Sequence, residues 1–346
     1  MQMNKTLKCF VAVALFGFAA PAYAQVYPER LDATRHAREA YQRRNDDRRA
    51  QAVDRSTHTV HIGPDGSLDV SNIAGDITVT RGSGSDARIE VVQTARGTDD
   101  ADAREQLALV RVDITEQNGR AEVRERYPER NNGEHRRNYQ LTTDFTIAAP
   151  AGTHLILKSV SGNLTVTGIT GEVSAETVSG NVQLSSGGRV TTAKSISGNV
   201  DVSDTKFDGS LEADSVSGDV RMQRVSARRI SIGSVSGNVR LDDVQSDRID
   251  AHTTSGNATF AGTLAPNGRY ELKSFSGEVR VALSGNVGFA LEASSFSGDV
   301  RSDLPLTVRG GDERHGRRRS LNGTYGDGSA VLNVSTFSGS VVIAKR

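Results

Sequence analysis

Four acidic side chains recur at one position of an internal repeat, and they are the carboxylates best placed for acid–base chemistry. They are Glu212, Asp250, Glu271 and Glu292. Hydrolysis of a polysaccharide needs two carboxyl groups that converge on one bond, either as acid and base or as acid and nucleophile. A polysaccharide-active enzyme on a long β-helix is therefore one hypothesis. A row of acids on a solvated face explains the same pattern.

A row of arginines occupies the third position after the repeated glycine. The row comprises Arg221, Arg240, Arg280 and Arg301. Guanidinium groups hold carboxylates and phosphates in two-point contact, so the row predicts binding to a repeating anionic polymer. The basic loop RHGRRR, from Arg314 to Arg319, would extend that surface. The alternative is that the arginines cover apolar surface and pair with the acidic row.

Every copy of the repeat carries a serine or threonine, but these hydroxyls do not indicate a nucleophile. A residue present in every copy is typical of a structural role, and His252 is the only histidine that accompanies the copies. The sequence contains no glycine-rich calcium repeat and no phosphate-binding loop followed by Lys-Ser/Thr. We expect no catalytic residue, no metal and no cofactor.

Residues 1–24 show the three parts of a secretory signal peptide. Lys5 and Lys8 precede the apolar run CFVAVALFGFAAPA, and AYA stands before Gln25. The single cysteine, Cys9, lies in this segment, so the mature chain would hold no thiol and no disulfide. We expect an exported protein, in the periplasm or at the cell surface, with no transmembrane span once the signal is removed.

Residues 25–55 mix arginines with acids and contain hardly any large apolar side chains. Such a segment buries too little apolar surface to offset its ordering entropy, which predicts a disordered tether or a solvated helix. The interleaved acids argue against a nucleic-acid-binding arm. The formal net charge of +0 indicates no class of partner.

Strings of the type SVSGNV recur along the second half of the chain. Aligned on their glycines, the copies lie about 20 residues apart, which is the period of a solenoid coil. The aligned glycines are Gly162, Gly180, Gly198, Gly218, Gly237, Gly256, Gly277, Gly298 and Gly339. We therefore predict an all-β fold, a β-solenoid similar to a single-stranded β-helix.

The regular coils should span residues 152–346, with one coil opened into a long loop near 303–329. Residues 56–151 read as an irregular β-rich part of the same domain that caps the coils. In this part we expect a helix over Asp99–Leu109 and a hairpin around Asn118 and Gly119.

Apolar alternation changes phase at the motif, which predicts a corner there. We place the change between Ser234 and Val235, with the glycine in a conformation closed to other residues and the next Asn or Asp bonding locally. This placement sends the residue after the Ser/Thr into the interior. The expected interior ladder is Val160, Val178, Ile196, Val216, Val235, Thr254, Phe275, Phe296 and Phe337.

A ladder of hydroxyl residues runs beside it, and we expect these side chains to bond from coil to coil. It comprises Ser159, Thr177, Ser195, Ser215, Ser234, Thr253, Ser274, Ser295 and Thr336.

The repeated motif, the signal peptide and the closing string YGDGSAVLNVSTFSGSVVI together resemble the bacterial DUF4097 "putative adhesin" β-strand repeat family. The resemblance covers roughly residues 56–346 and implies the β-solenoid fold. The adhesin label is attached to a fold and implies no activity. Segment 25–55 and the insert near Arg309 lie outside the common pattern.

These observations favour an exported, non-catalytic protein of the cell envelope or surface, adhesin-like or a scaffold. Its expected partner is an anionic polysaccharide, lipopolysaccharide or another envelope protein. The alternatives are the polysaccharide-active enzyme and an envelope-stress or regulatory module that binds through its variable loops. The sequence makes no prediction of oligomeric state.

Overall fold

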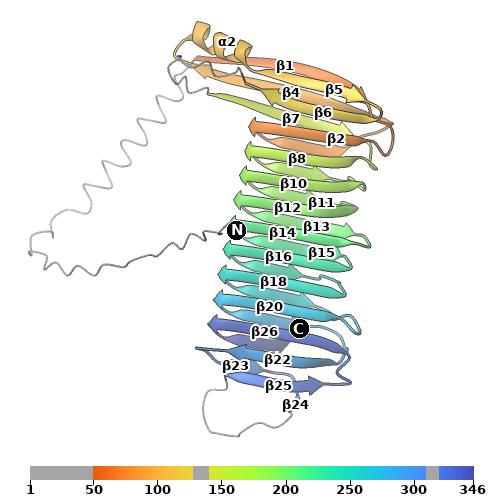
Figure 1. The fold of residues 1–346 in the computed structure, drawn as a ribbon, viewed down its shortest axis with the longest axis vertical. Helices are drawn as coiled ribbons and strands as arrows, with labels where there is room; N and C mark the ends of the chain where they lie inside the picture. Colours follow the sequence, from red (N-terminus) through yellow and green to blue (C-terminus); the bar gives the residue numbers. More distant parts are fainter. Residues whose placement is uncertain (1–49, 128–139, 309–318) are drawn as a thin grey trace, which may run out of the picture. The chain divides into compact units, whose positions relative to one another are not determined.

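The computed structural model describes residues 50–127, 140–308 and 319–346, all within one compact unit, Ala50–Arg346. In this unit the strands stack one above another in two long sheets, between which the chain alternates (Figure 1). This arrangement is the β-solenoid that the repeats predict.

Three predictions fall outside the described residues. They are the signal peptide over 1–24, the charged segment up to residue 49, and the basic loop except for Arg319.

The two sheets contain 13 and 14 strands. In spatial order the first sheet comprises β1 (Ala50–His61), β4 (Asp86–Gly97), β7 (Leu141–Ala149), β3 (Ile77–Arg81), β9 (Leu164–Thr167), β11 (Val182–Ser185), β13 (Val200–Lys206), β15 (Val220–Ser226), β17 (Val239–Asp242), β19 (Ala258–Gly262), β21 (Val279–Leu283), β27 (Val341–Lys345) and β23 (Val300–Ser302). The second comprises β24 (Thr307–Val308), β25 (Ser320–Tyr325), β22 (Phe289–Ser295), β26 (Ala330–Ser338), β20 (Arg269–Ser276), β18 (Arg248–Ser255), β16 (Arg229–Ser236), β14 (Ser210–Ser217), β12 (Arg189–Ser197), β10 (Glu172–Ser179), β8 (His154–Ser161), β2 (Ser67–Ala74), β6 (Arg120–Arg126) and β5 (Arg111–Gln117).

Each regular coil supplies one strand to each sheet, and equivalent strands of successive coils pair in parallel. Ser234 of β16 pairs with Thr253 of β18, and Val239 of β17 pairs with Ala258 of β19. These are the equivalences obtained by aligning the sequence on its glycines. The corner motif therefore sets the register of the whole stack.

The N-terminal part is β-rich and includes several antiparallel strand pairs. β1 begins at Ala50, inside the segment expected to be charged and unstructured, and pairs with β4. Strands β5 and β6 form the predicted hairpin, with positive φ at Asn118 and Gly119. The predicted helix is α2 (Asp100–Leu109), capped by Asp99.

Strands β2 and β3 belong to the regular stack although they lie before residue 151. β2 pairs in parallel with β8, and β3 pairs in parallel with β9. The loosely matching string NIAGDI, from Asn72 to Ile77, is thus the corner of a tenth coil. Regular coils begin within the stretch predicted to be irregular.

The order of coils at the C-terminal end differs from their order in the sequence. The last coil, β26 and β27, pairs with β20 and β21 on one side and with β22 and β23 on the other. Strand β25, from the insert, pairs antiparallel with β22. The prediction of one opened coil was wrong, because the insert lets the chain double back and slot its final coil inside the stack.

The core consists of the inward side chains of both sheets. Val173 and Ala175 of β10 face Val182 and Leu184 of β11 across the interior, and all four are buried. Thr177 continues the inward alternation and is 5% exposed. The next residue of the strand therefore points outward.

The expected interior ladder was wrong for this reason. Val160, Val178, Ile196, Val216, Val235, Thr254, Phe275, Phe296 and Phe337 are all exposed. The alternation continues through the Ser/Thr, and the phase changes only after two consecutive exposed residues, such as Val235 and Ser236. Serine takes the inward position because its hydroxyl finds a partner there.

That partner is the corner glycine of the preceding coil in the stack. The Ser234 hydroxyl donates to the carbonyl oxygen of Gly218 at 2.9 Å, and the Thr253 hydroxyl donates to that of Gly237 at 2.8 Å. The same bond forms from Thr177, Ser195, Ser215, Ser274, Ser295 and Thr336. The prediction of hydroxyls bonding from coil to coil is confirmed for these eight residues. It is wrong for Ser159, whose buried hydroxyl has no partner among the described residues.

The corner glycines are needed because coils approach closely there. A Cβ added at Gly237 would fall on the carbonyl group of Gly218, and the other corner glycines meet the same obstacle. At Gly237 backbone strain is not the reason, because this glycine does not have a left-handed φ.

In the coils from Asp76 to Asn257, the side chain after the corner glycine bonds between coils instead of locally. The Asn238 side chain accepts a hydrogen bond from the backbone N–H of Asn257 at 3.0 Å, and Asp219 accepts one from that of Asn238 at 2.8 Å. The ladder begins at Asp144, which accepts from the N–H of Asp76.

A second corner, at the end of the first-sheet strands, holds a column of left-handed residues. Gly168 begins it with φ 76°, and Ser186, Asp204, Arg224 and Asp243 follow with φ of 52–53°. Side chains other than glycine cost free energy in this region.

We expect Ser186→Gly to raise the free energy of unfolding by about 0.5–1 kcal/mol. Glycine removes the Cβ clash at positive φ, and the larger conformational entropy that glycine loses on folding cancels only part of this gain. Chemical denaturation measures this. The matched control is Ser185→Gly at the end of β11, where glycine should destabilise. Loss of stability in both variants would contradict the prediction.

Candidate docking surface on the second sheet

An exposed row of apolar side chains runs along the outer face of the second sheet. We call it the apolar ladder; in spatial order it is Ile73, Val160, Val178, Ile196, Val216, Val235, Thr254, Phe275, Phe337 and Phe296. Of the ten large apolar side chains exposed in the described residues, nine lie on this line, and Val53 is the exception. Scattered exposed apolar residues need no explanation, but a continuous line of them marks a surface that can be covered.

Three phenylalanines form one end of the apolar ladder. The rings of Phe275 and Phe337 stack with centroids 4.9 Å apart, and those of Phe337 and Phe296 lie 4.6 Å apart. The rings are 46–64% exposed. Because their faces stack against one another, mainly their edges reach solvent, and this end of the ladder stands higher than the valine end.

A row of mostly charged side chains runs parallel to the apolar ladder, two residues earlier in each strand. We call it the charged row; it comprises Lys158, Glu176, Lys194, Asp214, His252 and Lys273. Both rows point outward, about 7 Å apart at strand spacing. A groove runs between them across the strands.

The groove continues over most of the coils. One stretch, from Lys158 to Thr254, has a volume of ≈ 880 Å³. A second, from His252 to Phe337, has ≈ 740 Å³ and shares His252 and Thr254 with the first. Its floor is backbone already paired within the sheet, so a ligand would be bound by side chains.

The charges beside the groove are partly neutralised within the face. The Lys194 ammonium lies 2.8 Å from Glu212, which raises the pKa of Lys194 and lowers that of Glu212. Burial, and then a hydrogen bond with Glu212, raises the pKa of Asp214. Lys273 pairs with Glu271, which raises the pKa of Lys273.

The acidic row lies on this same outer face, as its repeat position requires. Glu212 and Glu271 pair with lysines of the charged row, and Asp250 lies 3.9 Å from His252. These contacts support the reading of the acids as parts of a solvated, charge-balanced face.

The arginine row lies on the outer face of the first sheet. Arg221 lies 3.8 Å from Asp201, Arg280 lies 2.8 Å from Glu278, and Arg301 lies 3.2 Å from Asp299. These three arginines therefore pair with acids beside their own strands. The alternative interpretation had paired the arginines with the acidic row, and none of these contacts does so.

The coil order also interrupts the arginine row, since Val342 separates Arg280 from Arg301. Arg240 makes no ion pair with the described residues. Binding of an anionic polymer to this row stays a prediction.

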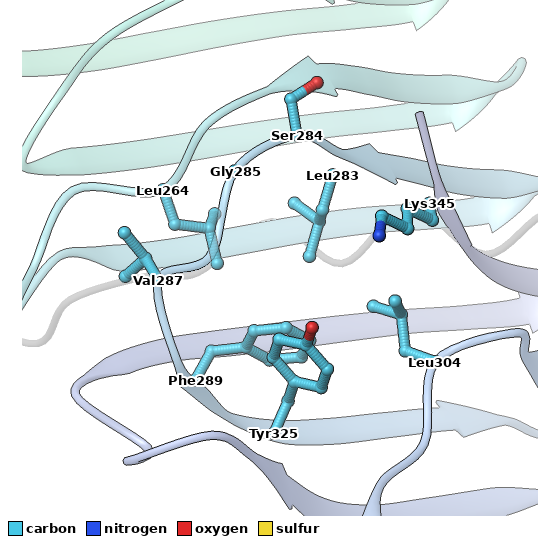
Figure 2. Close-up of a pocket in the computed structure, with 9 residues that line it drawn as sticks. All are labelled: Leu264, Leu283, Ser284, Gly285, Val287, Phe289, Leu304, Tyr325 and Lys345. Carbon is cyan, nitrogen blue, oxygen red and sulfur yellow. The ribbon is translucent and has the colours of Figure 1, made fainter.

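A small cavity lies in the core near the C-terminal end of the stack. Figure 2 shows its lining, with Leu264, Leu283, Phe289, Leu304 and Tyr325 directed around it. Its volume is ≈ 10 Å³, about the space of one water molecule, so it is a packing defect and not a ligand site.

The described residues contain neither a candidate metal site nor a candidate membrane-spanning helix. No group of three or more His, Cys, Asp or Glu side chains gathers there as a metal site. In the same ranges, no helix has the length and apolar character needed to span a membrane.

Sequence reasoning assigned the apolar ladder to the core. One signal favours the observed direction without deciding it. Ile230, Ile232 and Ser234 alternate with period two, so Val235 faces the other way in a strand that does not bulge before it. Buried hydroxyls with partners are common in protein interiors.

Stacked two-strand coils with one apolar and one basic outer row define a β-solenoid repeat protein that presents long linear surfaces. The chain belongs to the Toastrack DUF4097 family, whose model matches residues 67–344.

Three solved structures resemble this chain. A "putative cell adhesion protein" from Clostridium sporogenes is 10% identical, with a TM-score of 0.25, over 85% of this chain and 100% of that one. A "putative adhesin" from Bacteroides fragilis is 12% identical (TM-score 0.41; 84% and 96% covered). A "putative lipid binding protein" from Parabacteroides distasonis is 13% identical (TM-score 0.45; 85% and 97% covered). No curated protein matches the chain.

Proposed function

We propose that this is an exported, non-catalytic repeat protein of the cell envelope, adhesin-like or a scaffold, that acts by docking a partner on the apolar ladder. The observation that carries the proposal is that, within residues 50–127, 140–308 and 319–346, nine of the ten exposed large apolar side chains lie on one line. Covering such a line removes apolar surface from water, which is the main driving force of protein association.

Coil stacking by itself does not require apolar residues at this position. Cross-strand ladders of β-branched side chains do stabilise neighbouring strands. Thr254 shows that a polar β-branched residue also satisfies the position. We therefore infer that valine, isoleucine and phenylalanine at this position have a role beyond stacking, and that this role is to dock a partner.

Export is part of the proposal and is supported by the signal-peptide pattern of residues 1–24. The non-catalytic role is supported by the ion pairs that hold Glu212 and Glu271, the carboxylates first considered for acid–base chemistry.

Photo-crosslinking in cells that produce the protein tests the docking role. We expect Phe275→p-benzoylphenylalanine, on the apolar ladder, to give covalent adducts on illumination because a partner lies against that side chain. The readout is a shifted band on a denaturing gel, identified by mass spectrometry.

The matched control is Gln183→p-benzoylphenylalanine, which places the same probe at an exposed site on the first sheet. No adduct from position 275, or equal adducts from both positions, would refute docking on the apolar ladder.

A further inference from the structure

We propose that the occupant of the apolar ladder is a second copy of this chain, packed face to face and antiparallel about a two-fold axis that crosses the ladder between Val216 and Val235. This inference rests on the proposed function, because it names the partner of the same surface. It follows from the order of side-chain sizes and charges along the ladder.

Side-chain size is distributed unevenly along the ladder. The five positions from Ile73 to Val216 are aliphatic, and the far end carries three stacked phenylalanines. An antiparallel two-fold axis at the midpoint places every phenylalanine opposite a smaller aliphatic residue. The opposed pairs are Val216 with Val235, Ile196 with Thr254, Val178 with Phe275, Val160 with Phe337, and Ile73 with Phe296.

A parallel pairing fits less well. It would set the phenylalanines of one copy against those of the other and hold the valine halves apart. In the antiparallel pairing the high end of each ladder meets the low end of its partner, so the separation of the sheets stays even. Close packing at an interface core requires this complementarity.

The charged row matches under the same operation. Glu176 lies two coils from the N-terminal end of the ten stacked coils, and Lys273 lies two coils from the other end. The two-fold axis therefore places Glu176 opposite Lys273 of the second copy. Within one copy, Glu176 makes no ion pair with the described residues, while Lys273 pairs with Glu271. The two-fold axis forms the Glu176–Lys273 contact twice. Near the axis, Asp214 comes to lie opposite Gly233 of the second copy, and the His252 side chain of that copy lies over this glycine.

Two pairings do not join opposite charges. Lys194, which pairs with Glu212 of its own copy, faces His252, and at the far ends of the row of acids Asp69 faces Glu292. Asp69 lies 3.7 Å from Arg120 of its own copy, which offsets its charge. The pairing lies at the rim, where water screens it.

The buried area is sufficient for a specific dimer. Ten coils at strand spacing give a ladder of about 43 Å, and the three outward rows span about 14 Å. Covering this strip buries roughly 600 Å² per copy and about 1,200 Å² in total, which is the lower bound for specific interfaces. A reversible dimer of moderate affinity follows.

The inference is tested with charge reversals, measured by sedimentation velocity of the purified protein over a wide range of concentration. The parent should dimerise. Glu176→Lys and Lys273→Glu should each weaken dimerisation by about tenfold or more, because each leaves two like-charged pairs in the interface. The double variant should recover most of the parent affinity.

Recovery in the double variant can arise only between copies, because Glu176 and Lys273 lie five coils apart in one chain. The matched controls are Gln183→Lys and Arg280→Glu on the first sheet, which should dimerise like the parent. Melting temperatures exclude misfolded variants. A parent that stays monomeric at all concentrations, or a double variant weaker than both single variants, would overturn the inference.

The crosslinking experiment separates this inference from the proposed function. Adducts from position 275 that join two copies through a peptide near Val178 support both. Adducts with any other molecule overturn the two-fold dimer and leave docking on the ladder intact.

Discussion

Gly237→Ala is expected to lower the free energy of unfolding by about 3 kcal/mol, because the new Cβ would fall on the Gly218 carbonyl group and force two coils apart. Several bonds between coils meet there. The Ser234 hydroxyl donates to Gly218, and the Gly237 N–H donates to the carbonyl of Ser255 at 3.0 Å. Urea denaturation followed by circular dichroism measures the change.

The control for this prediction is Gly262→Ala at the end of β19. A Cβ added there would lie 3.3 Å from the Val244 backbone oxygen and 3.4 Å from the Phe260 ring. Small shifts of these neighbours would accommodate it. We expect a loss of less than about 1 kcal/mol, the usual range for tolerated core changes. Similar losses at both glycines would mean that the corner does not need close approach of the coils.

Glu125→Gln is expected to lower stability at neutral pH by about 1–3 kcal/mol, because one buried donor loses its acceptor. Glu125 is 9% exposed, and its two oxygens accept from the Thr143 hydroxyl at 2.6 Å and from the backbone N–H of Ile73 at 3.1 Å. Strand β6 pairs with β2 only as far as Ser71. Beyond that point the Glu125 side chain accepts the hydrogen bond from the backbone N–H of Ile73. A glutamine side chain offers one oxygen in place of two.

The same residue predicts a pH dependence. Burial raises the pKa of Glu125 above its ordinary value of 4.5. Below that value the carboxyl is protonated in both states. As pH rises through the raised pKa, the unfolded state ionises first and the contribution of the group to stability falls.

The parent should therefore lose stability relative to Glu125→Gln as pH rises from about 4.5 through this window. Denaturation of both proteins at several pH values measures the difference. A difference that stays constant, or that grows in favour of the parent, would argue against a raised pKa.

Features that recur in every coil could be predicted from the sequence, because a solenoid repeats one set of local interactions. The spacing of the glycines gave the coil length and the register, and the hydroxyl ladder followed from a serine or threonine in every copy. The caps and turn residues placed α2 at Asp100 and the hairpin at Asn118 correctly.

The direction of the apolar ladder could not be predicted in the same way. Alternation with period two is unchanged in form when it is shifted by one residue, so the pattern allows either Ser234 or Val235 to face inward. The choice depends on the Gly218 carbonyl, which belongs to another coil and is 2.9 Å from the Ser234 hydroxyl only after stacking. The exposure of the apolar ladder is a consequence of that contact.

The sequence by itself determined the β-solenoid, its corners and its register, because these depend on interactions repeated every coil. The tertiary structure decided which residues are exposed and where the last coil lies. Strands β22 and β26 offer nearly equivalent parallel partners to β20, and the insert is long enough to reach either order. In the folded protein β26 lies between β20 and β22, so the Phe337 ring stacks between those of Phe275 and Phe296.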